Sequence, residues 1–138
     1  MQNFSIDMRV SFGDCDPAGI VYYPNFFIWI DRIFHALLHE NLGGHARACK
    51  ELGAQGFGAM NTEMSFRSPA LEGDLVSVQI TGITWSGKSY SIDYQAHIGT
   101  RLVFEAVEVR GVFIRRDGRM RAGDVTPLKE RLQQAGCL

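Results

Sequence analysis

The segment from residue 24 to residue 41 reads PNFFIWIDRIFHALLHEN, and its pattern is that of a buried helix. Pro24 suits the first turn of a helix, where its missing N–H costs nothing, and the glycines at 43 and 44 are typical of a helix end. At about 100° per residue, the polar side chains form one stripe: Asp31, Arg32, His35 and His39. Most of the remaining circumference is apolar: Phe26, Phe27, Trp29, Ile30, Ile33, Phe34, Leu37 and Leu38. We therefore expect a helix from about Pro24 to Asn41 that is largely enclosed by other structure.

Segments with the alternating pattern of β-strands lie on both sides of this helix in the sequence. Alternation predicts strands at residues 4–12, 60–66, 76–85 and 90–98, and a long apolar strand is expected at 102–115. The alternation changes phase at Gly82, which predicts a β-bulge. Turn residues at 86–87 predict a hairpin, those at 117–118 predict another turn, and Thr126 with Pro127 predicts the start of a short final helix.

The order of these elements predicts an α+β fold. Long strands joined by hairpins form a curved antiparallel sheet of about five strands, and the one long helix fills its concave face. A small sheet with two open edges also suggests pairing with another subunit.

The composition is that of an ordinary globular protein. The 138 residues, 46% of them hydrophobic, fit a single domain over 1–138. Fourteen Lys and Arg against fifteen Asp and Glu give a formal charge of -1, which argues against general binding to nucleic acid or anionic membranes. The three cysteines (Cys15, Cys49 and Cys137) form no CxxC pair, and no signal peptide or membrane-spanning run is visible. We expect a soluble, reduced, cytoplasmic protein.

The loop at residues 12–25, FGDCDPAGIVYYPN, is the strongest candidate for a functional site. It places Asp14 and Asp16 just before the start of the central helix, where free N–H groups and the positive end of the helix dipole can hold an oxyanion. A carboxylate that faces this position can attack a carbonyl or activate water. The alternative is that both aspartates simply close the turn and cap the helix.

The run FGDCDPAGIVYYPNF, residues 12–26, resembles the active-site segment of the 4-hydroxybenzoyl-CoA thioesterase family of hotdog-fold proteins. Weaker resemblance covers most of the chain, through residues 66–70, 73–74 and 112–114. The resemblance implies the hotdog fold, in which an antiparallel sheet wraps one long helix. It also implies hydrolysis of aromatic acyl-CoA thioesters without a metal or cofactor, by a dimer or a dimer of dimers.

The resemblance also assigns roles to individual residues. Asp16 matches the catalytic carboxylate, and Tyr23 matches the residue whose backbone N–H binds the thioester carbonyl. Asp31 matches the helix carboxylate that reaches the ring hydroxyl of an aromatic substrate across the dimer interface, and Gly19 lies in the matched segment as a substrate-binding residue. Tyr23 together with Asp31 favours the aromatic branch over relatives of broader acyl specificity.

The hairpin at residues 85–89 matches a basic stretch that meets the phosphates of coenzyme A, but here only Lys88 is basic. Lys88 is therefore a predicted substrate-binding residue. Other phosphate contacts are open among Arg67, Arg115, Arg116 and Arg119.

Several alternatives remain open from the sequence. The spacing of Asp31, His35 and His39 is compatible with a metal site, although a polar stripe is favoured and no metal is predicted. Cys15 is a weaker candidate nucleophile, and Glu63 is a distant second to Asp16 as the catalytic carboxylate. The alternative functions are a thioesterase of broad short-chain specificity, a hotdog dehydratase or hydratase, and a non-catalytic acyl-CoA-binding protein.

Overall fold

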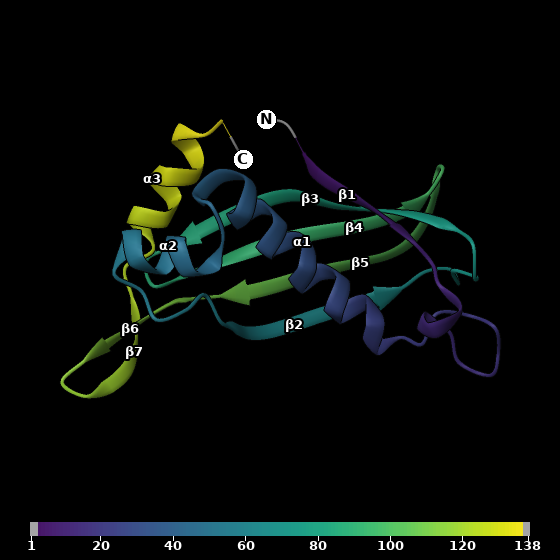
Figure 1. Ribbon diagram of the computed structural model, residues 1–138, viewed down its shortest axis with the longest axis horizontal. Coiled ribbons are helices and arrows are strands. Elements are labelled where there is room, and N and C mark those ends of the chain that lie inside the picture. The colour runs from purple at the N-terminus through teal and green to yellow at the C-terminus, as the bar shows by residue number, and fades with distance from the viewer. Residues whose placement is uncertain (1–2, 137–138) are drawn as a thin grey trace.

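The computed structural model describes residues 3–136 as one antiparallel sheet, a long helix packed across it, a small hairpin and two short helices (Figure 1). The elements in chain order are β1 (Phe4–Arg9), a 3-10 turn (Phe12–Asp14), α1 (Pro24–Leu42), α2 (His45–Leu52), β2 (Ala59–Phe66), β3 (Leu75–Ser86), β4 (Ser89–Ile98), β5 (Arg101–Arg110), β6 (Val112–Arg116), β7 (Arg119–Gly123) and α3 (Thr126–Gln134). The main sheet has five strands in the order β1-β3-β4-β5-β2, and all neighbours are antiparallel. The predicted hotdog architecture is confirmed.

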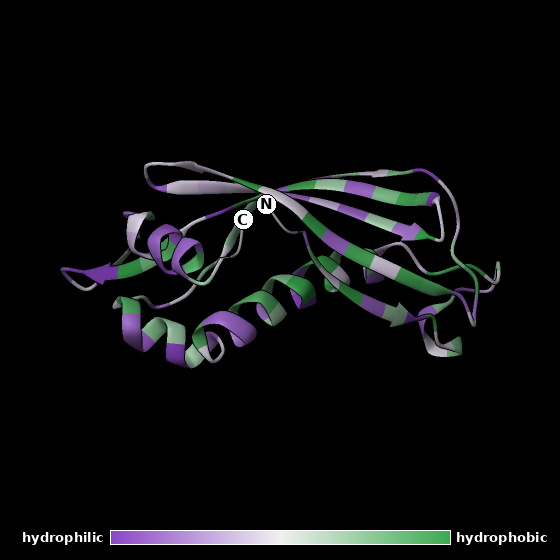
Figure 2. Cartoon of the chain, turned by 90° about the horizontal axis from the view of Figure 1, so that it is seen from above, coloured by the Kyte–Doolittle hydropathy of each residue, from purple (hydrophilic) through white to green (hydrophobic). Residues whose placement is uncertain are grey.

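Helix α1 forms a second layer against the sheet, as Figure 2 shows. It begins at Pro24, as predicted, and ends at Leu42 because Gly43 adopts a left-handed conformation with φ of 81°. The core between the layers combines the fully buried residues of α1 with those of the central strands: Ile33, Phe34, Leu37, Leu38, Val76, Val78, Ile80, Ile92, Tyr94 and Ala96. Burying such large side chains contributes about 1.5–3 kcal/mol each, so this contact fixes the position of α1.

One stripe of α1 remains open. Asp31, Arg32 and His39 are exposed there, as the sequence pattern predicts, and His35 is half-buried. The apolar side chain of Ile28 is 54% exposed and lies on the same stripe. The open stripe leaves Asp31 accessible to a ligand or to another chain.

Two predicted strands end earlier than the sequence pattern indicates. The first strand ends at Arg9 rather than residue 12, because Phe12 begins the 3-10 turn with its side chain 84% exposed. The strand expected at 102–115 divides at Gly111, whose N–H donates to Gly58 O (3.0 Å) instead of continuing a ladder. The part after this break, β6, pairs with β7, a strand that the sequence pattern did not indicate.

Other local predictions are confirmed. The register between β3 and β4 shifts between Ile80 and Gly82, which is the bulge expected at Gly82. The final helix begins at Thr126, as expected. Helix α2 was not predicted, and Cys137 lies outside the described residues.

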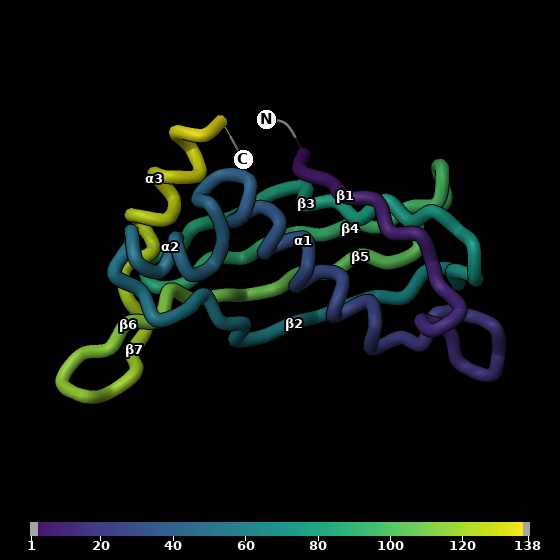
Figure 3. The backbone as a smooth tube through the Cα atoms, viewed as in Figure 1, coloured from purple at the N-terminus to yellow at the C-terminus, as the bar shows by residue number. Residues whose placement is uncertain are grey.

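The loop before α1 and the β6–β7 hairpin project from opposite ends of the molecule (Figure 3). Within residues 3–136, no helix is both long enough and apolar enough to cross a membrane.

Candidate active site

A short ladder makes the loop before α1 a defined structure. Cys15 pairs with Val21 in an antiparallel β-bridge, and the N–H groups of Asp16 and Tyr22 donate across the loop on either side of it. These backbone hydrogen bonds hold the tip of the loop, residues 17–19, in a fixed position relative to the start of α1.

Asp14 closes the turn, as the structural alternative predicts for it. Its Oδ2 accepts the N–H of Ser11 at 2.8 Å, and its main-chain oxygen accepts a hydrogen bond from Nδ2 of Asn25 at 2.8 Å. The side chain of Asp14 is thus occupied in holding the loop.

Asp16 keeps one carboxylate oxygen available. Its Oδ1 accepts the N–H of Ala18 at 2.9 Å, and its main-chain oxygen accepts the N–H of Gly19 at 2.9 Å. Gly19 has φ of 80°, a conformation that favours glycine. Within residues 3–136, Asp16 Oδ2 has no hydrogen-bond partner. Asp16 and Gly19 together line a pocket of about 400 Å³ with Phe12, Cys15, Pro17 and Glu72.

Tyr23 carries a free backbone N–H at the start of α1. Pro24 has no N–H, and the next two residues, Asn25 and Phe26, donate to Tyr22 O (2.9 Å) and Tyr23 O (3.1 Å). Among the described residues, the Tyr23 N–H has no acceptor. Because it lies at the positive end of the helix dipole, this N–H is suited to an oxygen that gains negative charge.

The side chain of Tyr23 borders an apolar pocket of about 420 Å³. The rings of Tyr23 and Phe66 meet edge to face with centroids 5.8 Å apart, and Phe26 lies 6.2 Å from Phe66. Aromatic side chains of Tyr23, α1 and β2 therefore line this pocket, which can take an apolar or aromatic group.

The thiol of Cys15 is a poor candidate nucleophile. Burial raises its pKa, and the nearby carboxylates of Asp14, Glu72 and Asp16 raise the pKa further. A raised thiol pKa lowers the fraction of the nucleophilic thiolate at neutral pH, which weakens this alternative.

Asp31 is held by a cation that the sequence analysis did not single out. Its Oδ1 accepts a hydrogen bond from Nη2 of Arg110 at 2.7 Å, and His35 Nε2 lies 3.5 Å from the same oxygen. Arg110 comes from β5, where it follows the buried Glu108 in the phase of the strand that faces the core. Two charged residues in the apolar phase of a strand are the signal that would have identified this pair.

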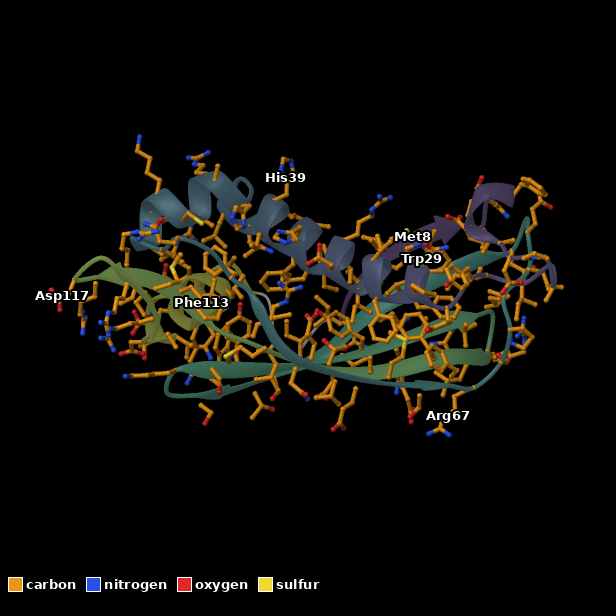
Figure 4. The ribbon with its side chains drawn as sticks, turned by 90° about the horizontal axis from the view of Figure 1, so that it is seen from below. Met8, Trp29, His39, Arg67, Phe113 and Asp117 are labelled. Carbon is orange, nitrogen blue, oxygen red and sulfur yellow. The ribbon has the colours of Figure 1, made fainter. Side chains whose placement is uncertain are left out.

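The stripe of Asp31, His35 and His39 does not form a metal site. Figure 4 shows His39 on the side of α1 that faces away from the sheet. Residues 3–136 contain no group of three or more His, Cys, Asp or Glu side chains placed to hold a metal ion. Burial lowers the pKa of His35, an effect that the carboxylate of Asp31 opposes.

Lys88 shares a pocket of about 530 Å³ with Arg116 of β6 and Arg121 of β7. The β6–β7 hairpin lies at the end of the molecule opposite the loop before α1 (Figure 1). Of the four arginines open from the sequence, only Arg116 lines this pocket with Lys88. Arg67 instead pairs with Glu105 at 2.8 Å. Arg121 was not among the candidate phosphate contacts of the sequence analysis. Its place beside Arg116 depends on the pairing of β6 with β7, in which Arg121 lies opposite Ile114 on the face that also carries Arg116.

Glu63 does not join Asp16. It lines a separate shallow pocket with Asp93 and Glu105 on the face of the sheet that points away from α1. The second-ranked catalytic carboxylate of the sequence analysis therefore lies on the wrong side of the sheet.

Residues 10–136 match the family model of the thioesterase-like superfamily. The chain is 31% identical over 134 residues to 4-hydroxybenzoyl-CoA thioesterase of Pseudomonas sp. strain CBS-3, covering 90% of this chain and 92% of that protein. A crystal structure of a mutant 4-hydroxybenzoyl CoA thioesterase with 4-hydroxybenzoyl CoA is similar with a TM-score of 0.83 and 27% identity, over 95% of this chain and 99% of the other. A gentisyl-coenzyme A thioesterase is similar with a TM-score of 0.67 and 30% identity, over 78% of this chain and 87% of the other.

Proposed function

The chain belongs to the thioesterase-like superfamily, and from that membership we propose that it hydrolyses acyl-CoA thioesters whose acyl group is a hydroxylated aromatic ring. The family match together with the similar thioesterases establishes thioester hydrolysis itself. The aromatic preference rests on the names of the similar enzymes, which act on 4-hydroxybenzoyl-CoA and gentisyl-coenzyme A.

One observation carries the proposed mechanism. On one hydrogen-bonded loop, Asp16 Oδ2 and the Tyr23 N–H are both without a partner among residues 3–136. In the proposed mechanism, the N–H of Tyr23 donates to the thioester carbonyl and stabilises its developing negative charge. Gly19 allows the tight turn that places Asp16 in the lining of the 400 Å³ pocket.

Asp16 then acts by one of two routes. As a nucleophile, its Oδ2 attacks the carbonyl carbon, coenzyme A leaves as the thiolate, and water hydrolyses the resulting mixed anhydride to the free acid. As a general base, it takes a proton from water, and the water oxygen attacks the same carbon. Both routes use the same free oxygen and give the same products.

We assign the acyl ring to Asp31 and the coenzyme A phosphates to the Lys88 pocket. Asp31 lies on the open stripe of α1, where its carboxylate can accept a hydrogen bond from a ring hydroxyl. Lys88, Arg116 and Arg121 present three positive charges to one pocket against the single carboxylate of Asp124, and this excess of positive charge suits a nucleotide with several phosphates.

We also propose that the enzyme works as a homo-oligomer, with β2 at the interface. β2 is an edge strand of eight residues, and most of its side chains are exposed, including those of Met60 and Phe66. A long edge strand that carries exposed apolar side chains is a template for pairing with another chain. In a dimer with two-fold symmetry, the β2 strands of the two copies would pair with each other, so that neither β2 edge stays open.

The test is a screen for thiol release over coenzyme A esters with aryl and alkyl acyl groups. We expect the 4-hydroxybenzoyl ester to be hydrolysed with a much higher kcat/KM than acetyl or hexanoyl esters. Equal rates on short alkyl esters would overturn the aromatic preference and favour a thioesterase of broad specificity. Tight binding without release of thiol from any ester would overturn the hydrolase assignment in favour of an acyl-CoA-binding protein.

A further inference from the structure

Two charged side chains of opposite sign are buried beneath α1. Arg110 and Glu108 project from β5 toward the core with side chains only 3% and 4% exposed. Arg110 Nε donates to Glu108 Oε1 at 2.6 Å, and Tyr94 Oη donates to the same oxygen at 2.8 Å. Buried charges of this kind are costly unless they are paired, and here each neutralises the other.

Arg110 is fixed on every side. Its Nη1 donates to the main-chain oxygen of Phe57 at 2.7 Å, and its guanidinium carbon lies 4.2 Å from the centre of the Phe34 ring. Its Nη2 lies 3.3 Å from Glu108 Oε2 and also donates to Asp31 Oδ1 at 2.7 Å. The guanidinium therefore has one possible orientation, and one of its N–H groups points from the core to the open stripe of α1.

The contact with Asp31 is more than the burial of Arg110 requires. Glu108 already supplies the counter-charge through two contacts, whereas Asp31 is 55% exposed and has access to water. The three side chains together carry one excess negative charge. That charge resides at the accessible end of the network, where a hydrogen-bond donor from a ligand can meet it.

The two oxygens of Asp31 are in different situations. Oδ1 is occupied by Arg110 and approached by His35 Nε2 at 3.5 Å. Within residues 3–136, Oδ2 has no hydrogen-bond partner. A carboxylate held by one oxygen presents the other in a defined direction, as a hydrogen-bond acceptor with little freedom to rotate away.

We propose that Arg110 is a positioning residue for substrate selection: it holds Asp31 so that Oδ2 accepts the ring hydroxyl of the acyl group. This inference rests on the proposed function, because it assumes that Asp31 meets the acyl ring. It adds that the preference for a hydroxylated ring depends on a buried arginine that does not touch the substrate. Glu108 supports the preference indirectly, because it fixes the guanidinium.

The experiment compares kcat and KM for 4-hydroxybenzoyl-CoA and benzoyl-CoA, which share a leaving group and differ by the one hydroxyl. The main variant joins Arg110→Met with Glu108→Gln, so that no uncompensated charge remains in the core. We expect the ratio of the two kcat/KM values to fall about 10- to 100-fold, the usual effect of losing a charge-assisted hydrogen bond. In Arg110→Lys the ratio of the two kcat/KM values should fall by a smaller factor, because a lysine has no planar guanidinium with which to hold Glu108 and Asp31 at once.

Two further variants separate positioning from general stability. Adding Asp31→Asn to the main variant should lower the ratio little further, because both changes remove the same interaction. Arg131→Met breaks another Arg–Glu contact, the 2.8 Å pair with Glu51 between α3 and α2, and should leave the ratio unchanged. If the main variant does not fold, Arg110→Lys alone decides the matter.

The inference is wrong if the variants slow both esters equally, or if Arg110→Lys keeps the full ratio. A wild-type enzyme that hydrolyses both esters with equal kcat/KM overturns the role of Asp31, and this inference with it, but leaves the hydrolase assignment standing. A wild-type enzyme that hydrolyses neither ester overturns the proposed function itself.

Discussion

Replacing Asp16 with Asn should remove most of the turnover and leave the fold intact. The amide keeps an oxygen for the N–H of Ala18, now 2.9 Å from Asp16 Oδ1, and the main-chain contact with Gly19 does not involve the side chain. The substitution creates no cavity and breaks no turn. We therefore expect the free energy of unfolding to change by no more than about 0.5 kcal/mol.

The loss falls on Asp16 Oδ2, the carboxylate oxygen that has no hydrogen-bond partner among residues 3–136. In the Asp16→Asn enzyme, an amide nitrogen takes the place of Oδ2, and this nitrogen is neither a nucleophile nor a base at neutral pH. Removing a positioned acid–base or nucleophilic group typically costs about 10²- to 10⁴-fold in rate, which corresponds to about 3–5 kcal/mol of transition-state stabilisation. The N–H of Tyr23 remains, so a residual rate above that of the uncatalysed reaction should persist.

The assay is release of coenzyme A thiol from 4-hydroxybenzoyl-CoA, with kcat and KM determined separately. The expected result is a fall in kcat, with a dissociation constant for the ester close to that of the wild type. Asp14→Asn is the matched control, because it makes the same chemical change two residues away in a side chain that accepts the N–H of Ser11. A kcat of Asp16→Asn within about threefold of the wild type, or an equal loss in Asp14→Asn, would refute the assignment.

Three other variants test the phosphate pocket, the half-buried histidine and the sheet edge. The double variant with Lys88→Ala and Arg121→Ala should raise KM for the coenzyme A ester about 10- to 100-fold. The KM for the matching pantetheine ester, which lacks the nucleotide phosphates, should not change. An equal rise in KM for both esters contradicts the phosphate site. Burial lowers the pKa of His35 below its ordinary 6.5, so the unfolded state takes up a proton more readily than the folded state. The free energy of unfolding should therefore fall as the pH drops below about 6.5. Denaturant unfolding at pH 7 and pH 5 should show a smaller difference in this free energy for His35→Gln than for the wild type. Met60→Lys places a positive charge on the exposed β2 edge of each copy, so two paired copies would repel each other. The mass measured by sedimentation should shift toward the 15.4 kDa of one chain. A wild type that sediments as a monomer at every concentration contradicts the interface.

The sequence predicts those parts of the fold that have strong local signals. Helix α1 has a 3.6-residue apolar period, Pro24 at its start and a glycine at its end, so its bounds differ from the prediction by one residue. Helix α2 has only eight residues and buries only Ala48 among its side chains, so tertiary contact rather than pattern determines it. The position of β2 beside β5 is also invisible in the sequence, because pairing between distant strands leaves no local period.

The candidate site divides in the same way. Asp16 and Tyr23 lie in one continuous motif that resembles the active-site segment of a known family, so the sequence singles them out as candidates. Arg110 is 79 residues from Asp31, and their contact exists only because β5 crosses beneath α1. Glu108 and Arg110 occupy alternate positions of an apolar strand, and only the sheet register shows that both point into the core.

The separation of the two halves of the proposed site gives a physical reason for assembly. The loop before α1 lies at one end of the long axis, and the β6–β7 hairpin lies at the other (Figure 1). The first carries Asp16 and Tyr23, and the second contributes Arg121 to the pocket of Lys88. Helix α1, with 19 residues, alone spans about 28 Å of this separation at 1.5 Å per residue. At physiological ionic strength the Debye length is about 8 Å, so the positive charges of one hairpin have little influence on the loop of the same chain. A two-fold partner would reverse the direction of the long axis and bring its hairpin toward the first chain's loop. The positive surface itself needs no partner, because Lys88, Arg116 and Arg121 line one pocket within a chain whose formal charge is -1.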